Sequence, residues 1–382
     1  MINFVKYHSL AAILLVSLFA SCKDTDMEED DPFDPIEVEA YIDEQYTTSG
    51  TRAARLAASS LAQFSVYSFY NGVVKAKNVL FTNKNSKWVS SKTISWSTGA
   101  MDFYGISPTF DIASTNSVQS MNQTPKYFDY EVPTDVAKQT DVMYASLLKL
   151  KKTDTKGKLK FAFKPAMHYI GFTGKNSIGT DYKVYVKSII LHNVVSNGKF
   201  VFSATTKNLG SWTVASGTEA KYVNDTLVFA TPIELSSVNS SLTGSDYVVI
   251  IPQSCTKWNT TATNPIPIST ANANHNYYIE TVAQIIKDEG GNQTYLLGYP
   301  DAEVDADHPK YESVYFPAAA KSYKIGAGST LPILFNGGYN KDGLPYLENM
   351  DRGEGVIVEV SEWMDYIITP EDWVPVYEEL EF

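Results

Sequence analysis

The sequence predicts an all-β protein that folds as two β-sandwich domains. Aromatic residues make up 13% of the 382-residue chain and charged residues only 19%. A mixture rich in Tyr, Thr, Val and Ser suits pleated, half-buried strands better than helices. More than a dozen short strand-like runs follow one another, which is too many for one small sandwich. We therefore expect two sandwiches, over residues 53–180 and 181–382. Turn signals separate the runs at Asn71–Gly72, Asn197–Gly198, Gly290–Gly291, Gly337–Gly338 and Asp342–Gly343.

Residues 1–21 have the character of a signal peptide. Lys6 makes the start positive, and Leu10 to Ala20 is apolar apart from Ser17. About a dozen residues are too few to cross a bilayer as a helix, which needs roughly 20, but they fit the apolar core of a signal peptide. Cys22 stands where a lipoprotein peptidase leaves an acylated N-terminus, although Phe19 replaces the usual Leu three residues earlier. The alternative is an ordinary cleaved signal in which Cys22 plays no part.

The cysteine count agrees with lipidation. The chain has two cysteines, Cys22 and Cys255, so an acylated Cys22 leaves Cys255 without an intrachain partner. This excludes a disulfide framework and any C-x-x-C redox or zinc motif. Cys255 is most simply interpreted as a small buried apolar residue.

Residues 22–52 form an acidic leader. This segment holds eleven acidic and two basic residues, so it carries most of the chain's net charge of −12. Its first part has few apolar residues and should be a solvated tether. A partner made of nucleic acid is excluded, because phosphate binding needs clustered Lys and Arg.

Within the leader, residues 36–43 read IEVEAYID and predict a half-buried strand. Acidic residues and Tyr41 occupy one face of this leader strand. Chance alternation in a disordered leader is the alternative interpretation. The other face is apolar and consists of Ile36, Val38, Ala40 and Ile42.

Arg52 and Arg55 follow the leader strand in a loop-like stretch of small residues. They are the only basic residues between Lys23 and Lys75. An isolated Arg in an exposed loop is a favourable protease site. The alternative is two solvated surface arginines. The next segment, residues 60–70, again predicts a strand, whereas residues 141–151 are expected to be a short helix or an irregular crossover.

The C-terminal segment 366–382 resembles the leader strand in pattern. Two similar strands at opposite ends of a chain are what strand replacement needs, since both must fit one groove. Pro375 weakens the pattern because it cannot donate to a β-ladder. The alternative is a last strand that completes its own domain. The apolar face, interrupted by Glu378, consists of Val374, Val376, Leu380 and Phe382.

A search for catalytic motifs predicts no enzyme, metal or cofactor site. The chain lacks a phosphate-binding G-x-x-x-x-G-K-[ST], an H-E-x-x-H and a G-x-S-x-G. Asp301, Glu303, Asp305 and Asp307 alternate in a way that oxygen ligands of calcium do, but the central Gly and distal Glu of an EF-hand are missing. We therefore expect a solvated loop, with calcium as the alternative. The six tryptophans are expected in the core, with a sugar-stacking platform as the alternative.

The chain resembles the fimbrillins, which are pilin-like lipoproteins on the surface of Gram-negative gut and oral anaerobes. Four segments carry the resemblance: the export signal CKDTDMEEDD, the Arg loop TRAARLA, TDVMYAS with GKLKFAFKPAMHYIGFTG, and YVVIIPQ with FNGGYNKDG before a strand containing Val358, Val360 and Trp363. One departure is that Pro165 occupies the family's histidine position, with His168 three residues later. The match spans nearly the whole chain and rests on patterns of hydrophobic residues.

The resemblance implies two transthyretin-like β-sandwich domains and a structural role in a fimbria, as a subunit or adhesin. It implies an acyl anchor on Cys22 in the outer membrane, and an arginine-specific surface protease that removes the leader strand at Arg52 or Arg55. A strand of another pilin subunit would then fill the groove, by β-augmentation. Residues 366–382 would be the donor strand. Host or bacterial surface ligands are further expected partners.

A second function class shares the anchor and the all-β fold. A surface glycan-binding lipoprotein of a nutrient-uptake system would need exposed aromatic side chains in a flat row. The position of the tryptophans separates the two hypotheses.

Overall fold

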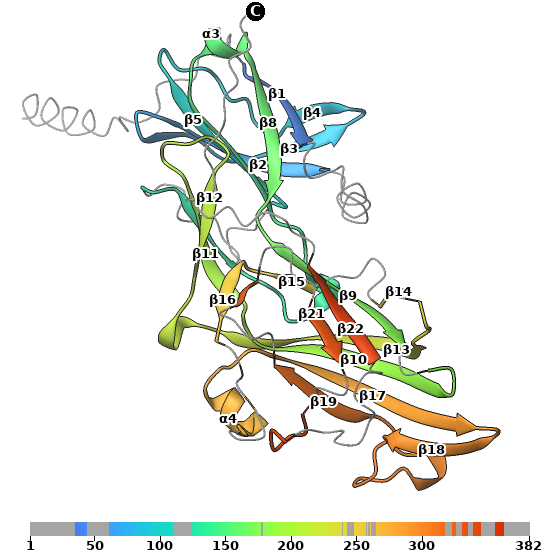
Figure 1. Cartoon of the computed structure of the whole chain (residues 1–382). Helices are drawn as coiled ribbons and strands as arrows, with labels where there is room; N and C mark the ends of the chain where they lie inside the picture. The colour runs from blue at the N-terminus through green and yellow to red at the C-terminus, as the bar shows by residue number, and fades with distance from the viewer. Residues whose placement is uncertain are drawn as a thin grey trace, which may run out of the picture.

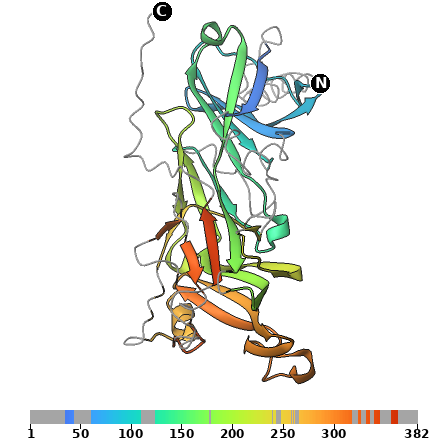
Figure 2. The same cartoon turned by 45° about the vertical axis from the view of Figure 1, so that its right-hand side comes forward.

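The computed structural model places most of the residues that it describes in strands, and so confirms the all-β prediction. The molecule is elongated, with β1 to β5 near one end and β17 to β19 near the other (Figures 1 and 2). The division into two domains at residue 180 stays a prediction. The structure describes residues 35–43, 61–109, 124–176, 179–238, 240–242, 248–256, 258, 260, 265–317, 323–325, 331–334, 339–344 and 356–362.

A seven-stranded sheet forms the upper end of the molecule, in the order β1-β8-β7-β5-β2-β3-β4. The Asn71–Gly72 turn joins β2 to β3, and both residues have positive φ, as a two-residue hairpin turn requires. The strands are β1 (Glu37–Ile42), β2 (Gln63–Tyr70), β3 (Val73–Lys84), β4 (Lys87–Ser90), β5 (Met101–Ser107), β7 (Met143–Leu150) and β8 (Lys158–Pro165).

Both faces of this sheet are covered by apolar side chains. Along β7, Met143 and Ala145 face one core while Tyr144 faces another. We call the first the upper core; its large members include Phe64, Phe81, Trp96, Phe103, Phe161 and Phe163. The second, the middle core, lies under a three-stranded sheet in the order β12-β11-β6. These strands are β6 (Tyr127–Glu131), β11 (Asn197–Phe202) and β12 (Gly210–Val214).

The middle core joins residues from both sides of the predicted domain boundary. Phe128 of β6 and Phe200 of β11 stack with ring centroids 5.1 Å apart. Trp212 of β12 donates its indole N–H to the carbonyl of Ala166, which follows β8. Segments before and after residue 180 therefore share one packed interior.

The lower end is built from two further sheets around a third core, which includes Phe172, Leu191 and Phe316. One sheet has the order β13-β10-β17-β18, with β19 also paired to β17, and the other has β14-β9-β22-β21, with β15 also paired to β9. The strands are β9 (His168–Asn176), β10 (Tyr182–Val195), β13 (Tyr222–Glu234), β14 (Ser240–Ser241), β15 (Val248–Ile250), β17 (Tyr278–Glu289), β18 (Asn292–Leu297), β19 (Glu312–Pro317), β21 (Leu331–Leu334) and β22 (Val356–Glu362).

The remaining described elements are short. These elements are the pair β16 (Gln253–Cys255) and β20 (Tyr323–Ile325), the helices α3 (Lys152–Thr155) and α4 (Ile268–Ala273), and the 3-10 turns η3 (Val136–Lys138), η4 (Gly217–Glu219) and η5 (Asp301–Glu303). Within the described ranges, no helix has both the length and the apolar character needed to cross a membrane.

Two local predictions were wrong. Residues 141–151 form strand β7 for most of their length, not a helix or crossover, because apolar packing on both faces of the sheet hides the period of two. Asn197–Gly198 is not a turn but the start of β11. A Cβ on Gly198 would lie 3.0 Å from the Thr213 carbonyl oxygen, so this glycine allows close strand packing instead.

Candidate functional site

The leader strand is present as β1, with the alternation that the sequence predicts. Ile36 is buried, and Val38, Ala40 and Ile42 are half-buried against the upper core. Tyr41, on the opposite face, is 44% exposed. The apolar face of β1 is therefore part of the interior, and we call the space that it occupies the leader groove.

One side of the leader groove is β8. β1 runs parallel to it, from the pair Glu37 and Lys158 to the pair Ile42 and Phe163 (Figures 1 and 2). β7, the other neighbour of β8, pairs with it only at Lys164 and Pro165. Over residues 158–163, β1 is therefore the only strand partner of β8 in the described part of the chain.

Asn208 occupies the gap between β7 and β8. It lies in the β11–β12 loop, and its side-chain amide donates to the Ala162 carbonyl of β8 at 3.1 Å. Its side-chain oxygen accepts from the Ser146 backbone N–H of β7 at 2.8 Å. One side chain thus bonds to the backbone of both strands where the two do not pair.

The other side of the leader groove is formed by β4 and the segment that follows it. The backbone N–H of Ile36 donates to the Ile94 carbonyl at 2.8 Å, and Pro35 forms an isolated antiparallel bridge with Ser95. The indole N–H of Trp88 in β4 donates to the Ala40 carbonyl at 3.2 Å. β1 therefore lies between β8 and β4 and links the two ends of the curved sheet.

The outward face of β8 is basic, opposite the acidic face of β1. Lys158 and Lys160 lie 3.2 and 4.0 Å from the Glu39 carboxylate. At the end of the strand, burial lowers the pKa of Lys164, and the negative charge of Asp43 acts in the opposite direction. Charge complementarity thus accompanies the apolar contact along the groove.

Loss of β1 would uncover the upper core and the edge of β8 together. Full burial of a Val or Ile side chain contributes about 1.5–3 kcal/mol, and each backbone hydrogen bond about 0.5–1.5 kcal/mol net. β1 therefore contributes several kcal/mol, a large part of the 5–15 kcal/mol that typically stabilises a domain. The exposed edge would offer unpaired backbone groups to another strand.

The other predicted site residues lie outside the described residues. Cys22, Arg52, Arg55 and the C-terminal positions Val374, Val376, Leu380 and Phe382 belong to this group. Their roles stay predictions. Sequence patterns did not identify Trp88, Asn208 or Lys164 as parts of the groove, because each lies far along the chain from the residue with which it interacts.

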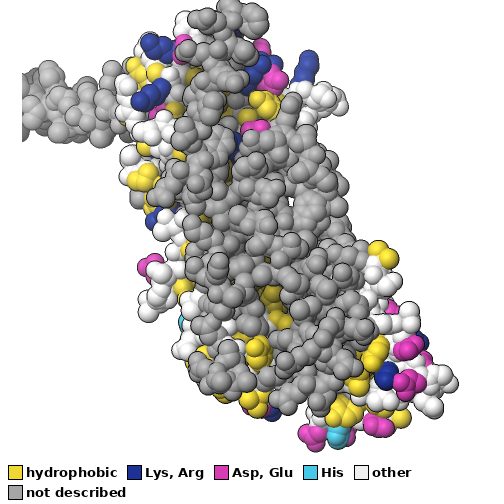
Figure 3. All heavy atoms as spheres, in the orientation of Figure 1, with side chains coloured by type: hydrophobic (Ala, Val, Ile, Leu, Met, Phe, Trp, Pro, Cys, Tyr) yellow, Lys and Arg dark blue, Asp and Glu magenta, His cyan; other side chains and the backbone are white. Residues whose placement is uncertain are grey.

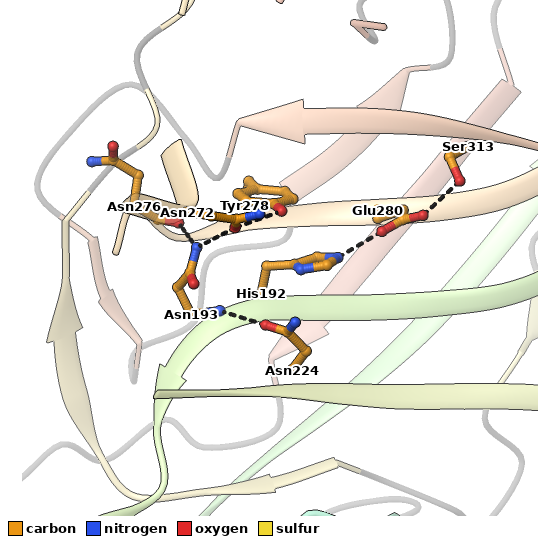
Figure 4. Close-up of polar contacts among 8 residues, drawn as sticks. All are labelled: His192, Asn193, Asn224, Asn272, Asn276, Tyr278, Glu280 and Ser313. Carbon is orange, nitrogen blue, oxygen red and sulfur yellow. Dashed lines mark hydrogen bonds and ion pairs between the residues drawn. The ribbon is translucent and has the colours of Figure 1, made fainter. Parts of the chain in front are cut away.

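A polar cluster between β10, β17 and β19 is the nearest approach to catalytic chemistry. His192 Nε2 lies 2.7 Å from a Glu280 oxygen, and the Ser313 hydroxyl donates to the other oxygen at 2.5 Å (Figure 4). Burial raises the pKa of Glu280, but the hydrogen bonds with His192 and Ser313 outweigh it and hold the pKa below its usual value. The serine therefore bonds to the acid and not to the histidine, unlike a Ser-His-Asp nucleophile.

Neighbouring side chains lock this cluster in place. The His192 ring stacks on Tyr278 with centroids 4.3 Å apart. The next residue, Asn193, has a φ of 62° and donates to the Asn272 side chain and the Asn276 carbonyl (Figure 4). The cluster fastens β10 to β17 and to the segment around α4.

The acidic residues 301–307 form a turn with internal partners. Asp301 pairs with Lys310 at 2.6 Å, and Asp305 accepts from the backbone of Asp307 and the ring of His308. Acidic side chains gather over this region at the lower end of the molecule (Figure 3). In the described part of the chain, no three His, Cys, Asp or Glu side chains are grouped to hold a metal ion.

The four described tryptophans pack into the protein. Trp96 and Trp258 are buried, while Trp88 and Trp212 are half-buried against the upper and middle cores. Trp363 and Trp373 lie outside the described residues. Among the described four, none is an exposed ring of the kind a flat sugar platform needs.

A fimbrillin-like family profile matches residues 34–308, a span that contains the leader strand, β8 and the whole upper core. The chain belongs to the fimbrillin-like family. Family membership supports a role as a fimbrial subunit and points to a structural rather than a catalytic protein. It also suggests assembly with other pilin subunits in a cell-surface fimbrium.

The fold of this fimbrillin-like protein is similar to that of a fimbrial protein from Bacteroides vulgatus ATCC 8482. The TM-score is 0.54 at 11% identity, covering 87% of this chain and 99% of that one. A putative cell adhesion protein from Bacteroides eggerthii DSM 20697 matches at 12% identity with a TM-score of 0.34, over 86% of this chain and 92% of that one. A search of curated proteins finds no match.

Proposed function

We propose that this fimbrillin-like protein is a subunit or adhesin of a fimbria, and that it assembles when its leader strand is replaced by a strand of another subunit. The observation that carries the proposal is the position of β1, which is the strand partner of β8 over residues 158–163 and lies over the upper core. A strand in this position protects an aggregation-prone edge until it is removed.

Removal requires a cut after β1. Arg52 and Arg55 follow the leader strand by about ten residues and are the proposed sites of an arginine-specific surface protease. The acyl chains on Cys22 would hold the chain in the outer membrane until that cut, after which the subunit joins the fimbrium.

The incoming strand must satisfy the same groove. The proposed donor is segment 366–382, which presents Val374, Val376, Leu380 and Phe382 on one face. Because β1 runs parallel to β8, a donor that takes over its contacts must run parallel to β8 as well.

Arginine-specific proteolysis of the purified protein tests this proposal. We expect a stable core that begins at Ala53 or Leu56, and a ladder of oligomers on a native gel. The double variant Arg52→Ala with Arg55→Ala should stay monomeric, whereas Arg352→Ala, which keeps both proposed sites, should behave as the wild type. Equal polymerisation of the double variant would rule the proposal out.

The glycan-binding alternative receives no support from the described tryptophans, all four of which pack against core side chains. Affinity electrophoresis on polysaccharide gels would test it directly. We do not adopt it.

A further inference from the structure

We propose that Lys164 selects the strand that fills the leader groove, by requiring a carboxylate at the position that Asp43 holds in the leader. The proposed occupant is a strand from a second copy of this chain. This inference rests on the proposed function, because it presumes that one strand replaces another beside β8.

The backbone register places Asp43 beside Lys164. β1 and β8 are paired up to Ile42 and Phe163, and the next backbone N–H, that of Asp43, donates to the Phe163 carbonyl at 2.9 Å. Lys164 is only 9% exposed and pairs with Tyr144 on its other side. The lysine thus lies at the end of the groove, next to the last residue of the described leader.

Because Lys164 is buried, it depends on a nearby counter-charge more than Lys158 and Lys160 of β8 do. A charge held away from water needs a counter-charge, whereas an exposed pair contributes little. Lys158 and its partner Glu39 are both 44% exposed. Asp43 is the charge that raises the pKa of Lys164 against the effect of burial. Departure of the leader removes that carboxylate from Lys164.

The C-terminal sequence of a second copy supplies a carboxylate in the required register. If Val374 takes the position of Ile36, then Leu380 takes that of Ile42, and Glu381 takes that of Asp43. In the same register Glu378 takes the position of Ala40, which is only half-buried. The apolar pattern and the terminal acid therefore coincide in one alignment.

A double-mutant cycle on the full-length protein tests the pair without any proteolysis. Asp43→Asn and Lys164→Met are made singly and together, and urea unfolding is measured for each. The expected coupling is at least tenfold in the unfolding equilibrium constant, since the double variant removes both members of the pair at once. The matched exposed pair, Glu39→Gln with Lys158→Met, should couple by less than threefold. Coupling as weak for the buried pair would overturn the inference.

A strand-exchange assay links the pair to partner choice. The protein is nicked by the arginine-specific protease, and a labelled synthetic peptide of residues 35–43 is added to replace its own leader. The Asp43→Asn peptide should exchange in at least tenfold less readily, and the Glu39→Gln peptide less than threefold. Equal exchange of the Asp43→Asn and parent peptides would overturn the inference.

The two failures can be told apart. If no peptide exchanges at all, the proposed function fails, and the full-length cycle still decides whether Lys164 and Asp43 act together. A charge-swapped combination, Lys164→Asp protein with an Asp43→Lys peptide, should restore exchange relative to either change alone. Without that rescue, the requirement for a carboxylate is wrong.

Discussion

At the scale of single residues, the fold depends on a few polar side chains that are enclosed by apolar surroundings. Asn208 bonds to the backbone of both β7 and β8 where those strands part. Asp225 in β13 is 2% exposed, and its described hydrogen bond comes from the Gln139 side chain at 3.1 Å. Burial raises the pKa of Asp225 to about 7, against a smaller lowering by Gln139. The stability of the fold therefore depends on the hydrogen bonds and protonation states of these residues as well as on apolar packing.

The raised pKa of Asp225 predicts a pH-dependent stability. The folded state keeps the proton up to about pH 7, whereas the unfolded chain loses it near pH 4, so the unfolding free energy falls as pH rises between these values. The loss is at most about 4 kcal/mol. Asp225→Asn removes the titration, and urea unfolding should show this variant more stable than the wild type at pH 8 but not at pH 5.

The exposed Asp129 provides the control for this measurement. Asp129→Asn should leave the difference between pH 5 and pH 8 unchanged, because that carboxylate is exposed. If Asp225→Asn shows the same pH dependence as the wild type, the group responsible lies elsewhere.

At the scale of elements, β1 is held by three kinds of contact. Its backbone pairs with β8, its apolar face packs on the upper core, and Trp88 of β4 bonds to its centre at Ala40. None of these contacts alone contributes more than a few kcal/mol, so the position of the strand depends on all three together. The period of two decides which substitutions weaken it.

Substitutions on the two faces of β1 should therefore differ. Val38→Asp puts a charge against the upper core and is expected to lower the unfolding free energy by about 2 kcal/mol or more. Tyr41→Asp places the same side chain on the exposed face and should change it by less than about 0.5 kcal/mol. Thermal unfolding at matched pH provides the measurement. Equal effects would contradict the inward placement of Val38.

At the scale of the whole molecule, the leader groove lies at one end and the third core, which includes Phe172, Leu191 and Phe316, at the other (Figure 1). The middle core lies between the two and contains residues from both halves of the chain, including Phe128 and Phe200. Loss of β1 should therefore destabilise the upper sheet first. The reason is that β1 is the described strand partner of β8 over residues 158–163.

Deletion of residues 22–52 should loosen the upper sheet selectively. Amide hydrogen exchange is expected to accelerate at least tenfold over residues 158–163, because their partner strand is gone. Exchange over the paired strands β10 and β17 should stay within about twofold of the full chain. A uniform acceleration along the molecule would mean that the two ends unfold as one unit. Monomer isolated by gel filtration is the sample for both chains.

The alternation of apolar and polar residues predicted more of this protein's structure than its chemical motifs did. The pattern of residues 36–43 was sufficient to predict β1 and its inward face, because a period of two is a local property of the chain. The same rule failed at residues 141–151, since β7 packs against a core on both faces and shows no clear alternation. The lipid anchor, the cleavage sites and the donor strand remain predictions from sequence.

By itself, the sequence determined that the protein is all-β, that residues 22–52 are strongly acidic, and that an amphipathic strand lies within them at residues 36–43. Only the tertiary structure decided that this strand pairs with β8, that it runs parallel to it, and that Trp88, Asn208 and Lys164 surround the groove. The reason is distance along the chain: Trp88 lies 48 positions from Ala40, and Asn208 lies 46 from Ala162. Local patterns specify strands, but the choice among many possible partners is made by packing the whole chain.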